Sequence, residues 1–279
     1  MIIWLASYPK SGNTFLRSLL ASYLYSRDGE FDFQLLENIQ QFPINDNFEK
    51  IGVDVKNKYL VAENYIRAQE EINKKKKLTL LKTHSSFCKM YNKFNFSNLK
   101  NSLGVIYIVR DPRNVVTSFS NHNTKPISDT VDLLCNDLAT SNEKNEVEVY
   151  LGSWNFNYNS WKVYKSSKKY LLVKYEDLVR DTKNAFIEII KFLNKLLNNQ
   201  SKIDIKKIEK IIEETNFLRM QEMEKKYGFK EAKINDHAGE KVKFFHLGPK
   251  NNWKKNLDKH SISKIEKKFG SEMKELGYI

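Results

Sequence analysis

The chain has 279 residues, 41% hydrophobic and 13% aromatic, which is enough to bury the core of one large α/β domain. Its 47 basic and 34 acidic residues give a net charge of +13, a balance that favours anions without distinguishing nucleic acid, anionic lipid or acidic glycan. Fixed-period repeats, low-complexity linkers and apolar runs of about 18 residues are absent from the sequence, which excludes solenoid, disordered and membrane-spanning architectures.

The first 26 residues predict a strand, a turn and a helix in direct succession. The apolar run Ile2–Leu5 is typical of a strand covered on both faces, and apolar residues then recur at helical spacing in the segment FLRSLLASYL. The turn between them contains Gly12, which lets the backbone approach a ligand, and Lys10, which adds positive charge beside the helix start. This arrangement favours phosphate or sulfate binding.

Residues 78–84, LTLLKTH, predict a second buried strand. Lys82 and His84 are two positions apart near its end, so their side chains point to one face. A neutral imidazole with a pKa near about 6.5 can take a proton from a hydroxyl, which makes His84 the candidate general base. A single histidine is more often a hydrogen-bonded structural residue, so this pattern alone leaves both roles open.

Residues 104–121, GVIYIVRDPRNVVTSFSN, predict another strand followed by a helix. The strand ends at Val109, Asp111 can cap the helix, and Pro112 suits its first turn. Ser118 is seven residues after Asp111 and lies on nearly the same helical face, close to Arg110. An arginine fork and a hydroxyl there could hold a second phosphate, although an arginine paired with Asp111 would give the same pattern.

A further strand, YLLVKY, ends at Tyr175. Alternation of strands and helices predicts a parallel sheet with helices on both faces and ligands at the carboxyl ends of its strands. Two anion sites at two such ends suit a nucleotide with phosphates at opposite edges of its ribose.

Four segments resemble one family. YPKSGNT resembles the 5′-phosphosulfate loop, YPKSGTTW, of sulfotransferases that use 3′-phosphoadenosine-5′-phosphosulfate (PAPS), with departures at Asn13 and Phe15. RDPRNVVTS is similar to the family's 3′-phosphate motif, LLKTHSSF to its KTHLP segment, and VKYEDL to its YEDL segment. The chain thus resembles the PAPS-dependent sulfotransferases, of the cytosolic and bacterial-like type, over nearly its whole length.

The resemblance implies a three-layer, P-loop-like α/β fold with a central parallel sheet, and transfer of the sulfuryl group of PAPS to a hydroxyl or, as the lesser alternative, an amine. It implies no metal and no specific nucleic-acid partner. The implied catalytic residues are Lys10, Lys82 and His84. The implied cofactor-binding residues are Lys10, Ser11, Gly12, Asn13, Thr14, Phe15, Arg110, Ser118, Tyr175, Thr215, Phe217, Gly248 and Lys250.

The C-terminal part departs from the family pattern. EETNFLRM resembles the family's T-S-F turn near adenine, with Thr215 and Phe217 matching. HLGPKNNW stands where the family shows RKGxxGDW, and only its glycine and tryptophan match. The missing arginine leaves open how the 3′-phosphate is clamped, with Lys250 and His246 as candidate substitutes.

Segments without motifs are expected to select the acceptor. Residues 27–75 and 121–150 are predicted to build its pocket, and residues 228–247 have the composition of a mobile lid or of an ordinary surface loop. Two other functions remain open. A P-loop kinase is disfavoured because Lys10 precedes Gly12 and no Walker spacing exists. A noncatalytic anion or nucleic-acid binder lacks a basic stripe interleaved with aromatics.

The small number of cysteines indicates the redox environment of the protein. Cys88 and Cys135 are too few for a disulfide framework or a metal quartet, so free thiols in a reducing compartment are expected. The sequence begins on its first core strand, which argues against a signal peptide. We therefore expect a cytoplasmic protein with a single domain over residues 1–279.

Overall fold

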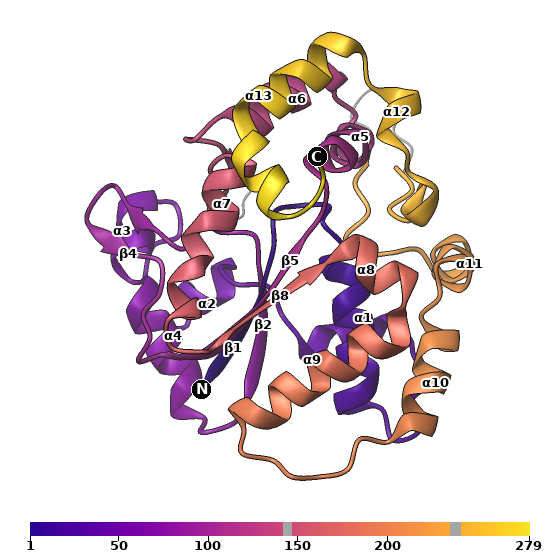
Figure 1. Cartoon of the computed structure of the whole chain (residues 1–279). Helices are drawn as coiled ribbons and strands as arrows, with labels where there is room; N and C mark the ends of the chain where they lie inside the picture. Colours follow the sequence, from indigo (N-terminus) through magenta and orange to yellow (C-terminus); the bar gives the residue numbers. More distant parts are fainter. Residues whose placement is uncertain (142–146, 235–240) are drawn as a thin grey trace.

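A four-stranded parallel sheet forms the centre of the protein (Figure 1). The computed structural model describes residues 1–141, 147–234 and 241–279. The strand order is β2–β1–β5–β8, with strands β1 (Ile2–Ala6), β2 (Thr79–Thr83), β5 (Ser102–Val109) and β8 (Tyr170–Lys174). Because all neighbouring strands are parallel, their carboxyl ends meet at one edge of the sheet, where β1, β2 and β5 lead into the expected site.

Helices cover both faces of the sheet, as the period-two alternation of β1 requires. Ile2, Trp4 and Ala6 belong to one core, and Ile3 and Leu5 belong to the other. The first core is closed by α2 (Asn45–Glu49), α3 (Lys58–Glu63), α4 (Tyr65–Lys74), α5 (Pro112–Asn123), α6 (Ile127–Cys135), α7 (Trp154–Ser160), η2 (Trp161–Lys165) and α13 (Lys259–Glu275). The second is closed by α1 (Asn13–Tyr25), η1 (Phe33–Asn38), α8 (Tyr175–Arg180), α9 (Thr182–Leu196), α10 (Ile205–Glu214) and α11 (Phe217–Tyr227). The predicted three-layer fold is confirmed.

The junction of β5 and α5 follows its sequence signals. The Asp111 side chain accepts a hydrogen bond from the backbone N–H of Arg113, and Pro112 is the first helical residue. The carboxylate of Asp111 pairs with the guanidinium of Arg113 at 2.7 Å, which leaves Arg110 oriented toward the cavity. The alternative pairing of Arg110 with Asp111 is therefore not what the structure shows.

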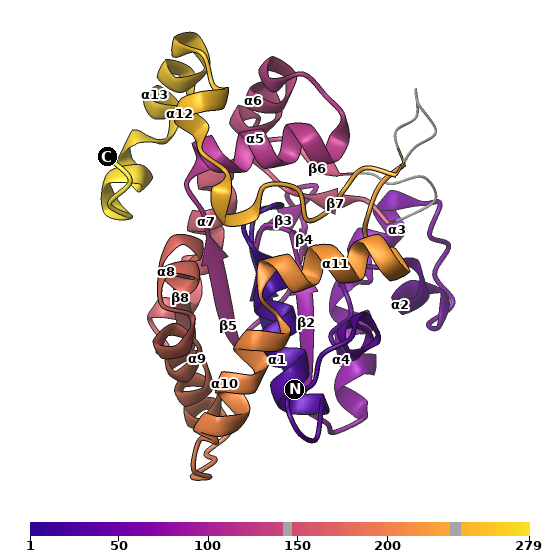
Figure 2. The ribbon, with the colours of Figure 1, turned by 90° about the vertical axis from the view of Figure 1, so that its right-hand side faces the viewer.

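Two antiparallel pairs were not predicted. They join β3 (Lys89–Met90) to β4 (Phe94–Asn95) and β6 (Thr140–Ser141) to β7 (Val149–Tyr150). Strands of two residues are too short to show a period in sequence. Figure 2 shows the segment after α11 running between α11 and α5, on its way to η3 (Gly248–Lys250) and α12 (Trp253–Asn256).

The four tryptophans have unequal environments. Trp4, Trp154 and Trp161 are 0–1% exposed within the first core. Trp253 is half-buried, with its backbone N–H donating to Asn114 Oδ1 and its ring 4.0 Å from the guanidinium carbon of Arg113.

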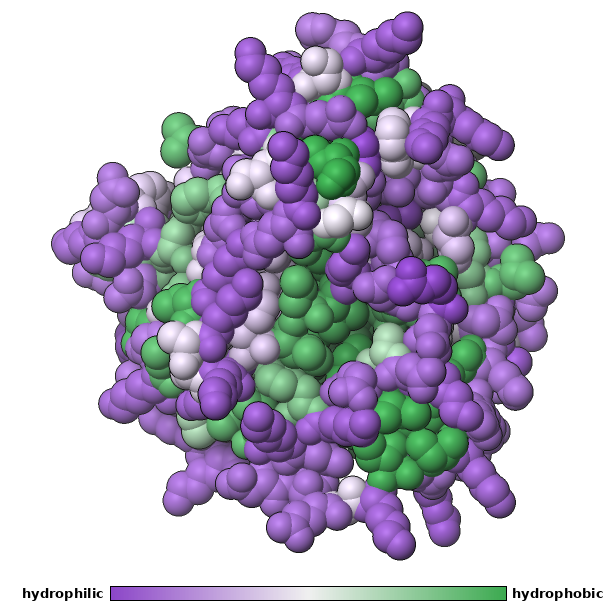
Figure 3. Space-filling model, in the orientation of Figure 1, coloured by the Kyte–Doolittle hydropathy of each residue, from purple (hydrophilic) through white to green (hydrophobic). Residues whose placement is uncertain are grey.

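Hydrophilic side chains cover most of the face in Figure 3, and apolar ones gather near its centre and near α10. Cys88 and Cys135 are free thiols, as predicted. Among the described residues, no helix combines the length and apolar character needed to cross a bilayer.

Candidate functional site

A cavity of about 1270 Å³ lies at the carboxyl ends of the strands. Thirteen of the fifteen residues proposed from the sequence line it: Lys10, Gly12, Asn13, Thr14, Phe15, Lys82, His84, Arg110, Ser118, Tyr175, Thr215, Phe217 and Gly248. Within the described chain, the other two lie elsewhere. Ser11 is fully buried within the loop, and Lys250 is exposed on η3.

The turn between β1 and α1 has the close packing expected of a ligand-binding loop. Lys10 and Gly12 have φ values of +61° and +100°. A Cβ on Gly12 would lie 2.4 Å from Cδ2 of Tyr175, so only glycine fits there. The first N–H groups of α1 follow directly, at the positive end of the helix dipole.

Arg110 joins the two strand–helix junctions. Its Nη1 donates to the backbone oxygen of Lys10 and its Nη2 to that of Gly248, each at 3.2 Å. The guanidinium carbon lies 4.3 Å from the centre of the Tyr175 ring. The residues of the two predicted anion sites are therefore neighbours around one cavity.

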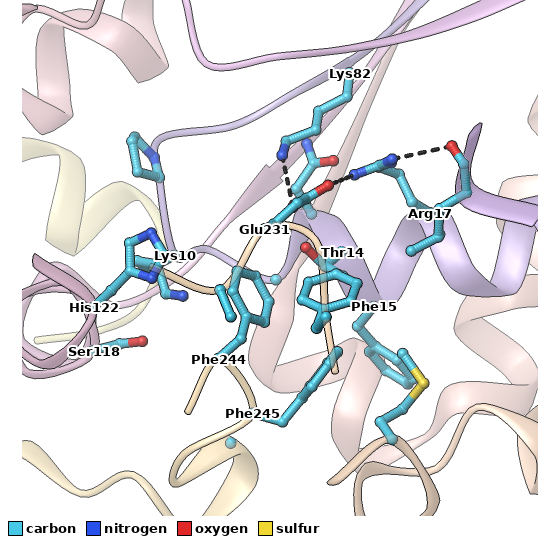
Figure 4. Close-up of a pocket in the computed structure, with 18 of the residues that line it drawn as sticks. Lys10, Thr14, Phe15, Arg17, Lys82, Ser118, His122, Glu231, Phe244 and Phe245 are labelled. Atoms are coloured by element: carbon cyan, nitrogen blue, oxygen red, sulfur yellow. Dashed lines mark hydrogen bonds and ion pairs between the residues drawn. The ribbon is translucent and has the colours of Figure 1, made fainter. Parts of the chain in front are cut away.

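The ammonium group of Lys10 lies 3.8 Å from the centre of the Phe244 ring (Figure 4). Burial lowers the pKa of Lys10 to about 7, the nearby carboxylate of Glu231 acts in the opposite direction, and the charges of Lys82 and Arg110 lower it further. A pKa this close to neutrality means that a bound anion would favour the charged form of Lys10.

Glu231 occupies the middle of the cationic side of the cavity (Figure 4). Its two oxygens contact Arg17 Nη1 at 2.5 Å and Lys82 Nζ at 3.0 Å. Burial alone would raise the pKa of Glu231, but Lys82 and Arg17 hold it well below its usual range. Sequence analysis missed this cluster because Arg17 and Glu231 are 214 positions apart and neither belongs to a motif.

The orientation of His84 is fixed by the end of β1. Nδ1 of His84 lies 2.9 Å from the backbone oxygen of Ser7 and 3.2 Å from its hydroxyl. A carbonyl oxygen only accepts, so Nδ1 carries the hydrogen and Nε2 keeps a free lone pair. Burial, reinforced by the charge of Lys82, lowers the pKa of His84 to about 3, which keeps the ring neutral at physiological pH.

A family model of the sulfotransferase domain matches residues 2–277. The chain belongs to the sulfotransferase family. The expected enzyme class, a PAPS-dependent sulfotransferase, is confirmed at this level.

Individual sulfotransferases are similar over most of their length. Sulfotransferase 2A1 of Macaca fascicularis is 24% identical over 97% of this chain and 83% of its own. Sulfotransferase 1B1 of Canis lupus familiaris is 25% identical over the same shares. Flavonol 3-sulfotransferase of Flaveria bidentis is 22% identical over 99% of this chain and 83% of its own.

Solved structures share the fold. Mouse sulfotransferase SULT7A1 complexed with PAP has a TM-score of 0.59 and 18% identity, over 98% of this chain and 84% of that one. Retinol dehydratase in a complex with retinol and PAP also has a TM-score of 0.59 and 18% identity, over 98% and 81%. Both structures support the arrangement of sheet and helices described above.

The segments expected to select the acceptor contribute to the cavity. Residues 27–75 provide Gln40, Gln41 and Ile44, and residues 121–150 provide His122 and Val149. The stretch proposed as a lid or surface loop lines it through Phe229, Glu231, Lys233, Phe244 and Phe245. Residues 142–146 and 235–240 lie outside the described residues. The described part of the chain contains no group of three or more His, Cys, Asp or Glu arranged to hold a metal ion.

Proposed function

We propose that this sulfotransferase binds PAPS across the β1–α1 and β5–α5 junctions and transfers its sulfuryl group to a hydroxyl-bearing acceptor, with His84 as general base. An amine is the lesser alternative as acceptor. The observation that carries the proposal is the Arg110 fork, which contacts the loop of Lys10 and lies beside Tyr175 in the same cavity as Ser118 and His84.

Unpartnered polar atoms support the fit of a nucleotide with two anionic groups. Among the described residues that line the cavity, the buried atoms Arg110 Nε and His122 Nδ1 have no hydrogen-bond partner. Buried polar groups are as a rule satisfied, so these two atoms support a ligand that completes the site. The first N–H groups of α1, which follow Gly12 directly, are donors that such a ligand would meet.

Different cations of the chain would bind different parts of the nucleotide. Lys10 and the first N–H groups of α1 would hold the 5′ end of the nucleotide, and Arg110 with Ser118 its 3′-phosphate. Tyr175, Phe15 and Phe217 offer aromatic surface for the adenine. Lys250 lies away from the cavity, whereas His246 lines it, so His246 is the better candidate to replace the missing arginine.

PAPS supplies an activated sulfuryl group, and its transfer is expected to resemble phosphoryl transfer, with charge growing on the leaving oxygen. Lys10 and Lys82 provide positive charge where that negative charge develops. His84 accepts the proton of the acceptor hydroxyl at Nε2, a step that contributes about 10²- to 10⁴-fold in such enzymes. His84→Ala is therefore expected to lose most turnover while keeping its affinity for PAP.

Thermal unfolding in the presence of PAP, ATP and single-stranded DNA tests the proposal. A ligand that binds the folded state stabilises it by about 2.7 kcal/mol at 100 times its Kd. PAP should raise the melting temperature, and Lys10→Ala and Arg110→Ala should remove that rise. A shift with ATP or DNA but not with PAP would instead favour a kinase or a nucleic-acid binder.

The acceptor is best sought by transfer of labelled sulfate from PAPS to pools of small alcohols, glycans and lipids. Labelling of any hydroxyl compound that depends on His84 supports the proposal. Labelling confined to amines would overturn the choice of hydroxyl acceptors.

A further inference from the structure

A chain of buried hydrogen bonds connects the anion loop to His84. The side-chain amide of Asn13 donates from Nδ2 to the backbone oxygen of Leu5 at 2.9 Å and to the hydroxyl of Ser7 at 3.1 Å. The same hydroxyl lies 3.2 Å from Nδ1 of His84. Ser7 is fully buried and Asn13 is 4% exposed, so these bonds are shielded from water.

The directions of these bonds determine the protonation of the ring. The backbone oxygen of Ser7 can only accept a hydrogen bond, whereas the Ser7 hydroxyl, which accepts from Asn13, keeps a hydrogen and a second lone pair of its own. The backbone oxygen of Ser7 therefore receives the Nδ1–H of His84, and the bond from Asn13 to the Ser7 hydroxyl helps to hold that backbone in place. The opposite tautomer would place a lone pair of Nδ1 against the carbonyl of Ser7 at 2.9 Å, which is repulsive.

We propose that Asn13 and Ser7 are positioning residues for the transfer step, which act through His84 by fixing its rotamer and tautomer so that Nε2 faces the acceptor hydroxyl. The proposal rests on the proposed function, which assigns His84 as the base. It gives Asn13 a role different from the rest of the loop, because its side-chain amide is directed at the end of β1 and not at the anion.

Asn13 is also a departure from the family pattern YPKSGTT. The asparagine amide has two hydrogens and donates to Leu5 and Ser7 at the same time, whereas a threonine hydroxyl has one hydrogen to donate. Asn13→Thr is therefore the substitution that keeps a family residue while removing one of the two bonds.

The charges around His84 also favour a neutral ring. Lys82 on β2 and Arg17 on α1 disfavour a protonated ring, and the carboxylate of Glu231, which both cations contact, acts in the opposite direction. These groups set whether the ring is charged. They do not choose between its two neutral tautomers, which is the property assigned to Ser7 and Asn13.

Ring ¹⁵N chemical shifts test the tautomer directly, in the protein alone and with PAP, with His84→Gln used to assign the signals. Wild-type protein should show Nδ1–H on His84. Ser7→Ala and Asn13→Thr, which remove the bond that holds the Ser7 backbone oxygen against the ring, should increase the share of Nε2–H. Ser18→Ala is the matched control, because Ser18 is also a fully buried serine but bonds only to the oxygen of Thr14. A wild-type ring with Nε2–H, or variants with unchanged shifts, would overturn the proposal.

Kinetics with labelled PAPS and 2-naphthol as the hydroxyl probe supply the second test. Asn13→Thr should lower kcat by about 10- to 100-fold, the loss seen when a hydrogen bond that orients a metal-ligating histidine is removed, with the Kd for PAP within about threefold. The double variant Asn13→Thr/His84→Ala should have the same kcat as His84→Ala alone, because a residue that acts only by positioning His84 has no effect once His84 is removed.

Other outcomes are equally decisive. If the losses of kcat from Asn13→Thr and His84→Ala multiply in the double variant, or if Asn13→Thr also weakens PAP binding, Asn13 only stabilises the loop. Either result would overturn the positioning role. A wild-type protein that binds no PAP would instead refute the proposed function itself. If 2-naphthol is not a substrate, the tautomer measurement decides alone.

Discussion

Lys10 combines a lowered pKa with a position at the centre of the anion loop. Its ammonium group rests on the ring of Phe244, and burial brings its pKa to about 7. A bound dianion stabilises the charged form, so binding takes up a proton at pH values above 7. We therefore expect the affinity for the nucleotide to depend on pH through Lys10.

We predict that PAP binds more weakly as the pH rises from 7 to 9. The loss of affinity approaches about tenfold per pH unit when one proton is taken up on binding. Titration calorimetry between pH 6.5 and 9 measures it, above the range near about pH 6 in which phosphate groups themselves titrate.

Lys10→Arg is the matched control, because a guanidinium group keeps its charge beyond about pH 12. Its affinity should be nearly flat over the same range. Equal slopes for wild type and Lys10→Arg would show that another group takes up the proton.

Glu231 places a carboxylate among the cations that the anionic nucleotide needs. We predict that Glu231→Gln binds PAP about tenfold more tightly, equivalent to about 1.4 kcal/mol, because Lys82 and Arg17 are released from their ion pairs. The same change should lower the stability of the ligand-free protein by about 1–3 kcal/mol, because buried donors lose their acceptor. Calorimetry and urea unfolding measure the two effects.

Glu37→Gln is the control for this prediction. Glu37 lines the same cavity, but its carboxylate lies 3.7 Å from Lys230 at the surface, where an ion pair contributes little. Weaker PAP binding by Glu231→Gln than by Glu37→Gln would mean that Glu231 helps to hold the nucleotide.

Site residues that belong to a motif could be predicted from the sequence. Site residues that meet only through a long-range contact could not. Lys10, His84 and Arg110 line the cavity because their strands end there. The ion pair of Arg17 with Glu231 joins α1 to a segment that follows α11, and no local pattern encodes such a pairing.

At the scale of elements, the turns between strands and helices determine where the residues of the site lie. Gly12 lies between β1 and α1 at φ +100°, directly against the ring of Tyr175 at the start of α8. The capping of α5 by Asp111 could be predicted, because a cap and its proline are adjacent in sequence. The pairs β3–β4 and β6–β7 could not, because their pairing depends on tertiary contacts rather than on a hydrophobic period.

Gly12→Ala should lower both stability and PAP affinity. A left-handed backbone costs an L-residue about 1–2 kcal/mol, and the new Cβ would also displace Tyr175 from the Arg110 guanidinium. We expect PAP affinity to fall at least about tenfold, because a backbone shift of this loop moves the N–H groups that face the anion. Urea unfolding and calorimetry measure the two losses.

Gly52→Ala is the control that separates the effect of backbone strain from the steric clash of Gly12→Ala with Tyr175. Gly52 has a φ of +74°, and a Cβ there would meet none of the described atoms within 4 Å. Its loss of stability should stay near about 1–2 kcal/mol with unchanged PAP affinity. A Gly12→Ala protein no less stable than Gly52→Ala would contradict the steric role of Tyr175.

At the scale of the whole molecule, both cores share one sheet. Residues of β1 alternate between them, and helices from the N-terminal and C-terminal parts of the chain close each one. We propose on this basis that residues 1–279 form a single domain. The order of strands and helices along the chain was predictable from the hydrophobic period. The strand order β2–β1–β5–β8 was not predicted, because local patterns do not specify neighbours in a sheet.

A single domain should unfold in one cooperative transition. We predict coincident melting curves by far-ultraviolet circular dichroism and by intrinsic fluorescence, and a joint shift of both with PAP. Two separate transitions, of which only one responds to PAP, would divide the cores into independent units and contradict the proposal.

The placement of the tryptophans gives the protein its own optical reporter. Three indole rings are sealed in the core, while Trp253 lies on Arg113 just after η3, whose Gly248 is bonded to Arg110. Acrylamide quenching and red-edge excitation will therefore sample this one ring preferentially. Occupancy of the neighbouring pocket can be followed by emission without any attached dye.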